Sequence, residues 1–240
     1  MISSMNLTSP MLVGLKAVPG KDWPERLASV KKLGLTELAL FLADLASEER
    51  RELYRVLEGS GIASIPYAQL PSSAEEWEPA YLSAKYATNV FSFRAEEKTY
   101  ALIAALPSPL PMILIENPRG SINPSLFSEQ ALQHPSVSGI CLDAGALELQ
   151  RLRGGKTYES AIATLDHYPV RCAFVSAIPE FWFGRLLGQK KKVTSLTDLH
   201  YLKHFPSIYF SGIVALCVDN SFEEQKEILA YLQSFFRPLV

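Results

Sequence analysis

Glu116 is the residue in this sequence whose type and position most clearly suggest chemistry. It follows the unbroken apolar run at residues 112–115 and is followed by Asn117 and a proline. A continuous apolar run of this kind predicts a strand that is buried on both faces. A carboxylate at its end is costly unless a cation or hydrogen-bond donors meet it. We therefore expect a functional strand end, with Glu116 available for acid–base work or for ligand binding.

Other polar side chains follow the remaining predicted strands. Asp143 ends a second predicted strand, at residues 137–143, and would share acid–base work with Glu116. Further candidate ligand-binding residues at strand ends are Tyr67, Gln69, Arg94, Asn117 and Asp219. If these side chains converge, they form one polar pocket.

Arg94 carries the positive charge in this set. Our hypothesis is that its guanidinium pairs with Glu116 on the next strand and offsets the cost of burying that carboxylate. The alternative is that Arg94 reaches solvent at its strand end. The distance between the two side chains decides between these interpretations.

Strands and helices alternate along the whole chain. The predicted strands cover residues 11–17, 38–43, 62–67, 89–94, 112–115, 137–143, 170–176 and 212–218, and the predicted helices cover 22–33, 47–58, 72–86, 96–105, a segment from 123, 157–167, 196–205 and 221–236. Alternation favours a parallel sheet, and eight units in 240 residues favour an α/β fold of the (β/α)8 TIM-barrel type. A doubly wound sheet is the alternative, but its glycine-rich first turn is missing at residues 18–21. No linker-like stretch interrupts the chain, so we expect a single domain over residues 1–240.

Composition and net charge indicate an ordinary globular protein and argue against some classes of partner. Hydrophobic residues make up 48% and charged residues 20% of the chain, as in ordinary globular proteins. The net charge of −2 does not favour nucleic acid or an anionic membrane, and no apolar run is long enough to span a bilayer. Three widely spaced cysteines fit a reduced, cytoplasmic protein, which we expect to be a monomer or homodimer.

Three strand ends, at residues 113–117, 139–143 and 172–177, resemble in order and spacing the xylose isomerase-like TIM barrels. That superfamily includes sugar isomerases and epimerases and apurinic endonuclease 2-like proteins. The resemblance covers nearly the whole chain. It implies a cluster of His, Glu and Asp that holds divalent metals, and it places the fifth-strand glutamate on Glu116 and the sixth-strand aspartate on Asp143.

Most of the family's other ligand positions are substituted here. Alanine, phenylalanine and cysteine stand where the resemblance implies a histidine, a histidine and a glutamate, at Ala146, Phe174 and Cys217. Gln69 stands where a histidine is common, and Arg94 falls near the fourth-strand position. Two carboxylates do not complete a metal site. We therefore expect no cofactor and no metal ligands, while a divalent metal remains the alternative.

Four other features have a structural and a functional interpretation. The histidines, at 134, 167, 200 and 204, are expected on or beside helices, away from the strand ends. The cysteines, at 141, 172 and 217, are expected to fill the barrel interior, with a soft-metal or redox cluster as the alternative. Residues 185–192 contain Arg185 and three lysines, which could bind phosphate or simply face solvent. Phe181, Trp182 and Phe183 could form a lid or a partner contact, or pack on the rim.

These observations favour a degenerate xylose isomerase-like barrel that binds a sugar, polyol or sugar phosphate at the C-terminal strand ends. One alternative is an active sugar isomerase or epimerase that uses Glu116 and Asp143. Another is a non-catalytic, partner-binding subunit. DNA repair ranks last because it needs the metal cluster and a basic groove.

Overall fold

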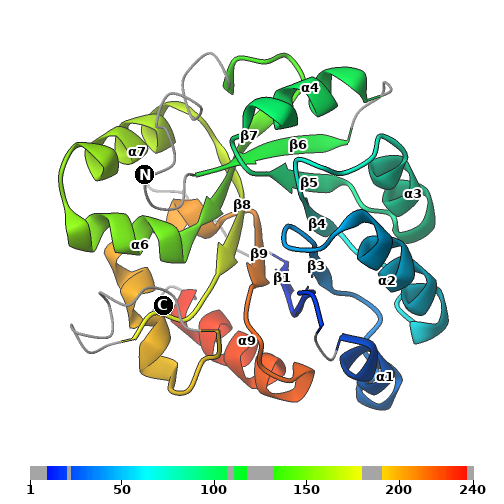
Figure 1. Ribbon diagram of the computed structural model, residues 1–240. Helices are drawn as coiled ribbons and strands as arrows, with labels where there is room; N and C mark the ends of the chain where they lie inside the picture. Colours follow the sequence, from blue (N-terminus) through cyan, green and yellow to red (C-terminus); the bar gives the residue numbers. More distant parts are fainter. Residues whose placement is uncertain (1–9, 21–22, 107–110, 118–131, 180–190, 237–240) are drawn as a thin grey trace, which may run out of the picture.

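The strands of the protein form one all-parallel sheet that curves into a barrel. The computed structural model describes residues 10–20, 23–106, 111–117, 132–179 and 191–236. The strands are β1 (Met11–Leu12), β2 (Gly14–Lys16), β3 (Ala39–Phe41), β4 (Tyr67–Leu70), β5 (Val90–Phe93), β6 (Met112–Glu116), β7 (Val137–Asp143), β8 (Val170–Val175) and β9 (Ile213–Leu216). Figure 1 shows them as an inner ring surrounded by helices.

The barrel closes through its first strand, which is split in two. β1 pairs with β9 while β2 pairs with β3, so the two pieces act as one strand of an eight-stranded barrel. At the join, a Cβ on Gly14 would lie 1.8 Å from the carbonyl oxygen of Leu216, which explains the glycine. The buried side chain of Gln225 replaces sheet bonding there: its Oε1 accepts from Gly14 N at 2.7 Å and its Nε2 donates to Gly14 O at 3.0 Å. The fold is the predicted TIM barrel.

Helices cover the outside of the strand ring (Figure 1). They are α1 (Trp23–Leu33), α2 (Ser47–Ser60), α3 (Trp77–Tyr86), α4 (Glu97–Ala105), α6 (Ala144–Arg153), α7 (Lys156–His167), the 3₁₀ helices η2 (Leu196–His204) and η3 (Ser207–Phe210), and α9 (Phe222–Phe236). Among these described residues, no helix has the length and hydropathy required to cross a bilayer.

One predicted strand is misplaced, and one helix was not predicted. The third strand was expected at residues 62–67 but lies at Tyr67–Leu70, and the earlier segment contributes one bridge, between Glu37 and Ser64. Ile65 is buried although it precedes the strand, so its apolar character alone was misleading. Helix α6 was not expected, because its first turn, Ala144–Gly145–Ala146, lacks amphipathic periodicity and is entirely buried. The helix predicted from residue 123 begins outside the described residues.

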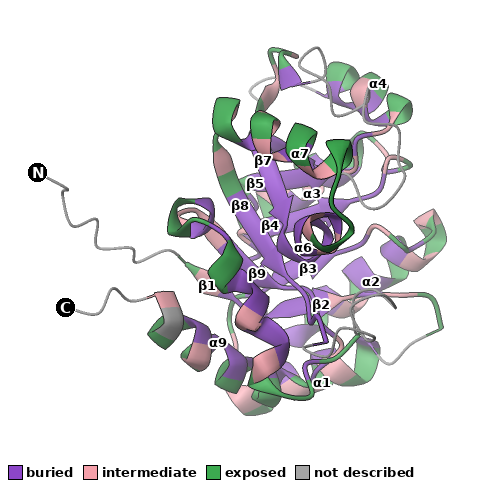
Figure 2. Cartoon of the chain, turned by 90° about the vertical axis from the view of Figure 1, so that its left-hand side faces the viewer, coloured by how far each residue is buried: buried purple, intermediate pink, exposed green. Residues whose placement is uncertain are grey.

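Two apolar layers stabilise the barrel. Figure 2 shows the strands as almost wholly buried. Side chains that point into the barrel form a separate cluster: Leu12, Ala39, Phe41, Tyr67, Val90, Leu114, Cys141, Cys172, Phe174, Ala215 and Cys217. All three cysteines are therefore core residues, as predicted. The predicted helical placement of His167, His200 and His204 is also confirmed.

Candidate functional site

Glu116 lies inside the barrel, at the C-terminal end of β6. It is 2% exposed, and two side chains donate to its Oε1 atom. Gln69 Nε2 on β4 and Ser92 Oγ on β5 each lie 2.8 Å from that oxygen. Three strands therefore contribute to one buried polar cluster, which we call the Glu116 cluster: Tyr67, Gln69, Ser92 and Glu116.

Tyr67 is the fourth member of the cluster and precedes Gln69 by two residues on β4. Its hydroxyl lies 2.7 Å from Ser92 Oγ and 3.4 Å from Cys141 Sγ. Because the single Ser92 hydroxyl proton is directed to Glu116, Tyr67 donates to Ser92. Burial raises the pKa of Tyr67 well above its ordinary value, and Cys141, Cys172 and Glu116 raise it further, so the phenol stays protonated. Tyr67 thus holds Glu116 through Ser92.

Strand periodicity explains why these side chains meet. Successive residues of a strand alternate between the two faces, and Tyr67, Val90 and Leu114 point into the barrel. Residues two positions later, Gln69, Ser92 and Glu116, therefore also point inward. In TIM barrels, inward side chains from alternate strands share a layer, which brings Gln69 on β4 beside Glu116 on β6.

Ser92 is the site residue that the sequence analysis missed. A lone hydroxyl between Phe91 and Phe93 carries no motif. Its position could have indicated its role, because Ser92 stands two residues after Val90, which faces inward, and its strand is the neighbour of the strand that carries Glu116.

Asp143 is fully buried at the end of β7, and its carboxylate caps a helix. Its Oδ1 accepts from Ala146 N at 2.9 Å, at the start of α6. Asn117 holds its backbone: Asp143 N donates to Asn117 Oδ1, and Asn117 Nδ2 donates to Asp143 O at 3.2 Å. Asp143 and Asn117 are therefore neighbours, as expected for adjacent strand ends. The proposed catalytic role of Asp143 stays a prediction.

Arg94 has a different partner from the one in our hypothesis. Its Nη2 donates to Asp44 Oδ1 at 2.9 Å. Among the described residues, the ion pair of Arg94 is with Asp44 and not with Glu116. Asp44 follows β3, fifty positions away in the chain, so sequence proximity gave no sign of this pair.

Asp219 lies beyond β9 and faces the first strand. Its Oδ1 lies 3.9 Å from Lys16 Nζ, and its backbone N donates to Lys191 O at 2.7 Å. Lys16 shares its register with Phe41, which points into the barrel, so Lys16 is an inward-facing cation at the mouth. The sequence analysis did not single out Lys16.

At two positions where the resemblance implies metal ligands, the side chains pack in the barrel interior. Phe174 packs on Phe41 with ring centroids 5.7 Å apart, and Cys217 is buried beside the same interior cluster. Within the ranges that the structure describes, no group of three or more His, Cys, Asp or Glu side chains could hold a metal ion. The segment with Phe181, Trp182, Phe183 and Arg185 lies outside the described residues.

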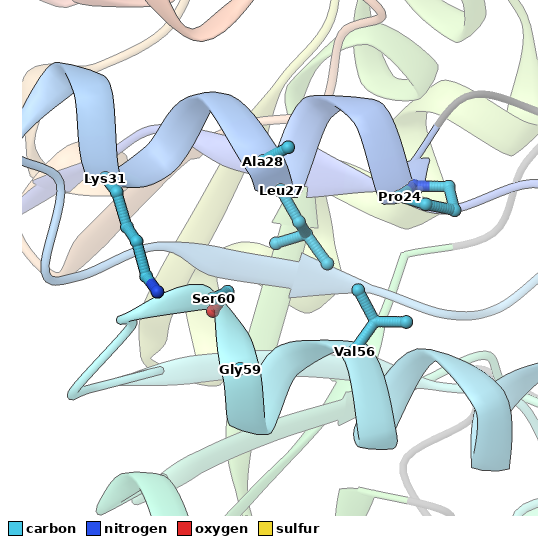
Figure 3. Close-up of a pocket in the computed structure, with 7 residues that line it drawn as sticks. All are labelled: Pro24, Leu27, Ala28, Lys31, Val56, Gly59 and Ser60. Carbon is cyan, nitrogen blue, oxygen red and sulfur yellow. The ribbon is translucent and has the colours of Figure 1, made fainter.

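A separate hollow of about 400 Å³ lies on the outer surface between α1 and α2 (Figure 3). Leu27 and Val56 point toward one another across it, and Lys31 extends toward Ser60 at the end of α2. The Cγ atom of Lys31 would lie 3.3 Å from a Cβ on Gly61, so the Lys31 stem covers the helix end. None of the residues that line this hollow belongs to the Glu116 cluster.

Comparisons with known proteins support the fold alone. No protein-family model and no curated protein sequence matches. An AP endonuclease, family 2, from Brucella melitensis is 12% identical, covers 95% of this chain and 99% of that chain, and has a TM-score of 0.50. Endonuclease IV from Thermus thermophilus is 14% identical over 93% and 98% of the two chains, with a TM-score of 0.49. Mannonate dehydratase from Streptococcus suis serotype2 is 10% identical over 95% and 93%, with a TM-score of 0.46. The first of these agrees with the TIM-barrel fold.

Proposed function

We propose that the protein binds a small polar ligand at the C-terminal ends of its barrel strands, with Glu116 as the central contact. The observation that carries the proposal is the Glu116 cluster itself. A barrel interior is normally filled by branched apolar side chains. Here two polar side chains at the C-terminal strand ends converge on one carboxylate oxygen. In this fold, that end of the barrel is where ligands bind.

The ligand class follows from the chemistry of the mouth. A carboxylate accepts hydrogen bonds from hydroxyl groups, and the amide of Gln69 offers an oxygen as well as the donor that Glu116 uses. A sugar or polyol presents several hydroxyls at suitable spacing. Lys16 beside Asp219 adds a cation at the mouth, which also suits a sugar phosphate.

We propose further that the site works without the family's full metal cluster. Phe174 and Cys217 stand at two expected ligand positions and pack as core residues. Asp143, the second carboxylate of the cluster, caps α6. The same use of Asp143 favours ligand binding over isomerase chemistry by Glu116 and Asp143. We therefore rank the enzyme second, and we propose a cytoplasmic monomer or homodimer.

Calorimetric titration tests the proposal. The probes are D-xylose, D-ribose, xylitol and D-ribose 5-phosphate, added to wild type, to Glu116→Gln and to Glu97→Gln. Glu97 is an exposed residue of α4 and serves as the matched control. We expect at least one probe to bind, with affinity reduced about tenfold or more by Glu116→Gln, since a hydrogen bond to a charged group is lost.

Two outcomes would overturn the proposal. The first is no binding of any probe at millimolar concentration. The second is binding that Glu116→Gln leaves as strong as the control does. Elemental analysis of the same preparations tests the metal statement: near-stoichiometric metal in wild type that disappears in Glu116→Gln would show a working metal site instead.

A further inference from the structure

A second hollow lies at the opposite end of the barrel from Glu116. It has a volume of about 560 Å³ and is formed by the end of α7, the segment that enters β8, and η3. Val170, the first residue of β8, lines it, so it lies at the N-terminal ends of the strands. Nothing in the proposed sugar site extends to this face.

Two side chains with hydrogen-bond donors line the hollow. Arg171 is exposed, and Tyr209 is buried. Within the described part of the chain, neither the guanidinium nor the phenol hydroxyl forms a hydrogen bond or ion pair. Burial raises the pKa of Tyr209, and nearby Asp166 raises it further, so this hydroxyl remains a donor at neutral pH. The exposed Arg171 guanidinium suits a carboxylate, while the oxygen of Tyr209, close to Asp166, can accept a hydrogen bond from an ammonium.

The part formed by α7 presents acceptors. His167 Nδ1 lies 2.7 Å from Ala163 O, and because a carbonyl only accepts, Nδ1 carries the proton. In the neutral ring, Nε2 is then an acceptor. The exposed Asp166 carboxylate lines the same hollow, and the C-terminus of α7 adds the negative end of a helix dipole. Together these groups suit an ammonium.

The two charges do not neutralise each other. Among the described residues, no ion pair joins Asp166 to Arg171, although both line the same hollow. Ile208, 55% exposed, lies in the hollow as well and offers an apolar contact. By comparison, the hollow in Figure 3 has a single charged residue, Lys31, among the side chains that line it.

We propose that this hollow binds a free α-amino acid with an apolar side chain. The ligand carboxylate lies at Arg171, its ammonium lies at Asp166, His167 and Tyr209, and its side chain contacts Ile208. An amino acid is the smallest common metabolite that brings both charges and an apolar group to one site. The proposal is independent of ligand binding at Glu116.

Ligand-observed NMR and calorimetry test the proposal with L-phenylalanine and L-leucine. Two analogues each lack one charge: 3-phenylpropionate has no ammonium, and phenethylamine has no carboxylate. We expect one of the amino acids to bind and its affinity to exceed that of both analogues by about tenfold or more, because each lost contact involves a charged group.

Variants locate the site. Arg171→Gln and Asp166→Asn should each weaken binding about tenfold. Arg153→Gln, on α6, and Glu159→Gln, at the start of α7, are exposed controls that should leave it within about twofold. The proposal is overturned if neither amino acid binds at millimolar concentration, if an analogue binds as tightly as its amino acid, or if the site variants behave like the controls.

Discussion

Glu78 and Glu116 are both buried carboxylates, but they meet different partners. Glu78 lies in the first turn of α3, contacts α2 and is 1% exposed. Arg50 donates to both of its oxygens, from Nε at 2.8 Å and from Nη2 at 2.7 Å, and Tyr54 donates to Oε2 at 2.6 Å. Arg50 also donates to the carbonyl oxygen of Leu45. This ion pair is neutral overall and ties two helices together.

In the Glu116 cluster, the groups that donate to the carboxylate are uncharged. An amide and a hydroxyl orient one oxygen of the carboxylate but bring no opposite charge with them. The cluster also lies where barrel enzymes bind ligands, whereas Glu78 lies on the outer helices. The comparison shows that burial alone does not mark a functional carboxylate. The charge of its partners and its place in the fold are the better guides.

The largest expected effect is the loss of the structural pair. Glu78→Gln leaves the Arg50 guanidinium buried without its counter-charge, which should lower the free energy of unfolding by about 3–5 kcal/mol. Urea denaturation measures it. Glu52→Gln is the control, because the Arg55–Glu52 pair is exposed and should contribute less than about 1 kcal/mol. Equal losses in the two variants would remove the distinction between the two carboxylates.

A smaller effect is expected within the Glu116 cluster. Ser92→Ala removes the donor to Glu116 and the acceptor of Tyr67, and should cost about 1–3 kcal/mol. Tyr67→Phe removes only the hydrogen bond from Tyr67 to Ser92 and should cost about 1 kcal/mol. Because both variants break the same contact, the double variant should cost less than the sum. Strict additivity in urea denaturation would contradict the relay from Tyr67 to Glu116.

Asp143 provides a third test, since its carboxylate caps a helix. Asp143→Ala should cost about 1 kcal/mol, while Asp143→Asn should cost only a few tenths, because asparagine caps as well as aspartate. Thermal unfolding gives both values. If the asparagine variant loses as much stability as the alanine variant, the negative charge of Asp143 matters more than its cap.

The smallest effect concerns an exposed carboxylate beside the structural pair. Hydrogen bonds from Ser47, Trp77 and Arg51 lower the pKa of Glu75 from 4.5 to about 2. A lowered folded-state pKa means that ionised Glu75 stabilises the protein above pH 4.5 and that this stabilisation is lost as the pH falls toward 2. The stability difference between wild type and Glu75→Gln should therefore shrink over that range. A difference that stays constant with pH would contradict this assignment.

Much of the fold could be predicted from the sequence because strand and helix patterns are local. Glu116 stood out for the same reason, as a charge directly after an apolar run. The third strand was misplaced because Ile65, which packs under the helices, has the same apolar character as a strand residue.

The contacts of the site were harder to predict because they depend on residues far apart in the chain. Arg94 could be assigned to a strand end, but its pairing with Asp44 depends on a loop after another strand. The role of Ser92 follows only from the strand register, which places its side chain beside Glu116. The sequence did not show that Asp143 both ends a strand and caps a helix, because the first turn of α6 is made of small residues.

The free energy of unfolding of Glu116→Gln tests the central claim most directly. Glutamine has the same shape, and its amide oxygen can still accept from Gln69 and Ser92. If Glu116 is retained for a ligand, the variant should stay within about 1 kcal/mol of wild type in urea denaturation, while Glu78→Gln does not. A loss as large as that of Glu78→Gln would show that Glu116 is a structural charge, and would contradict the account.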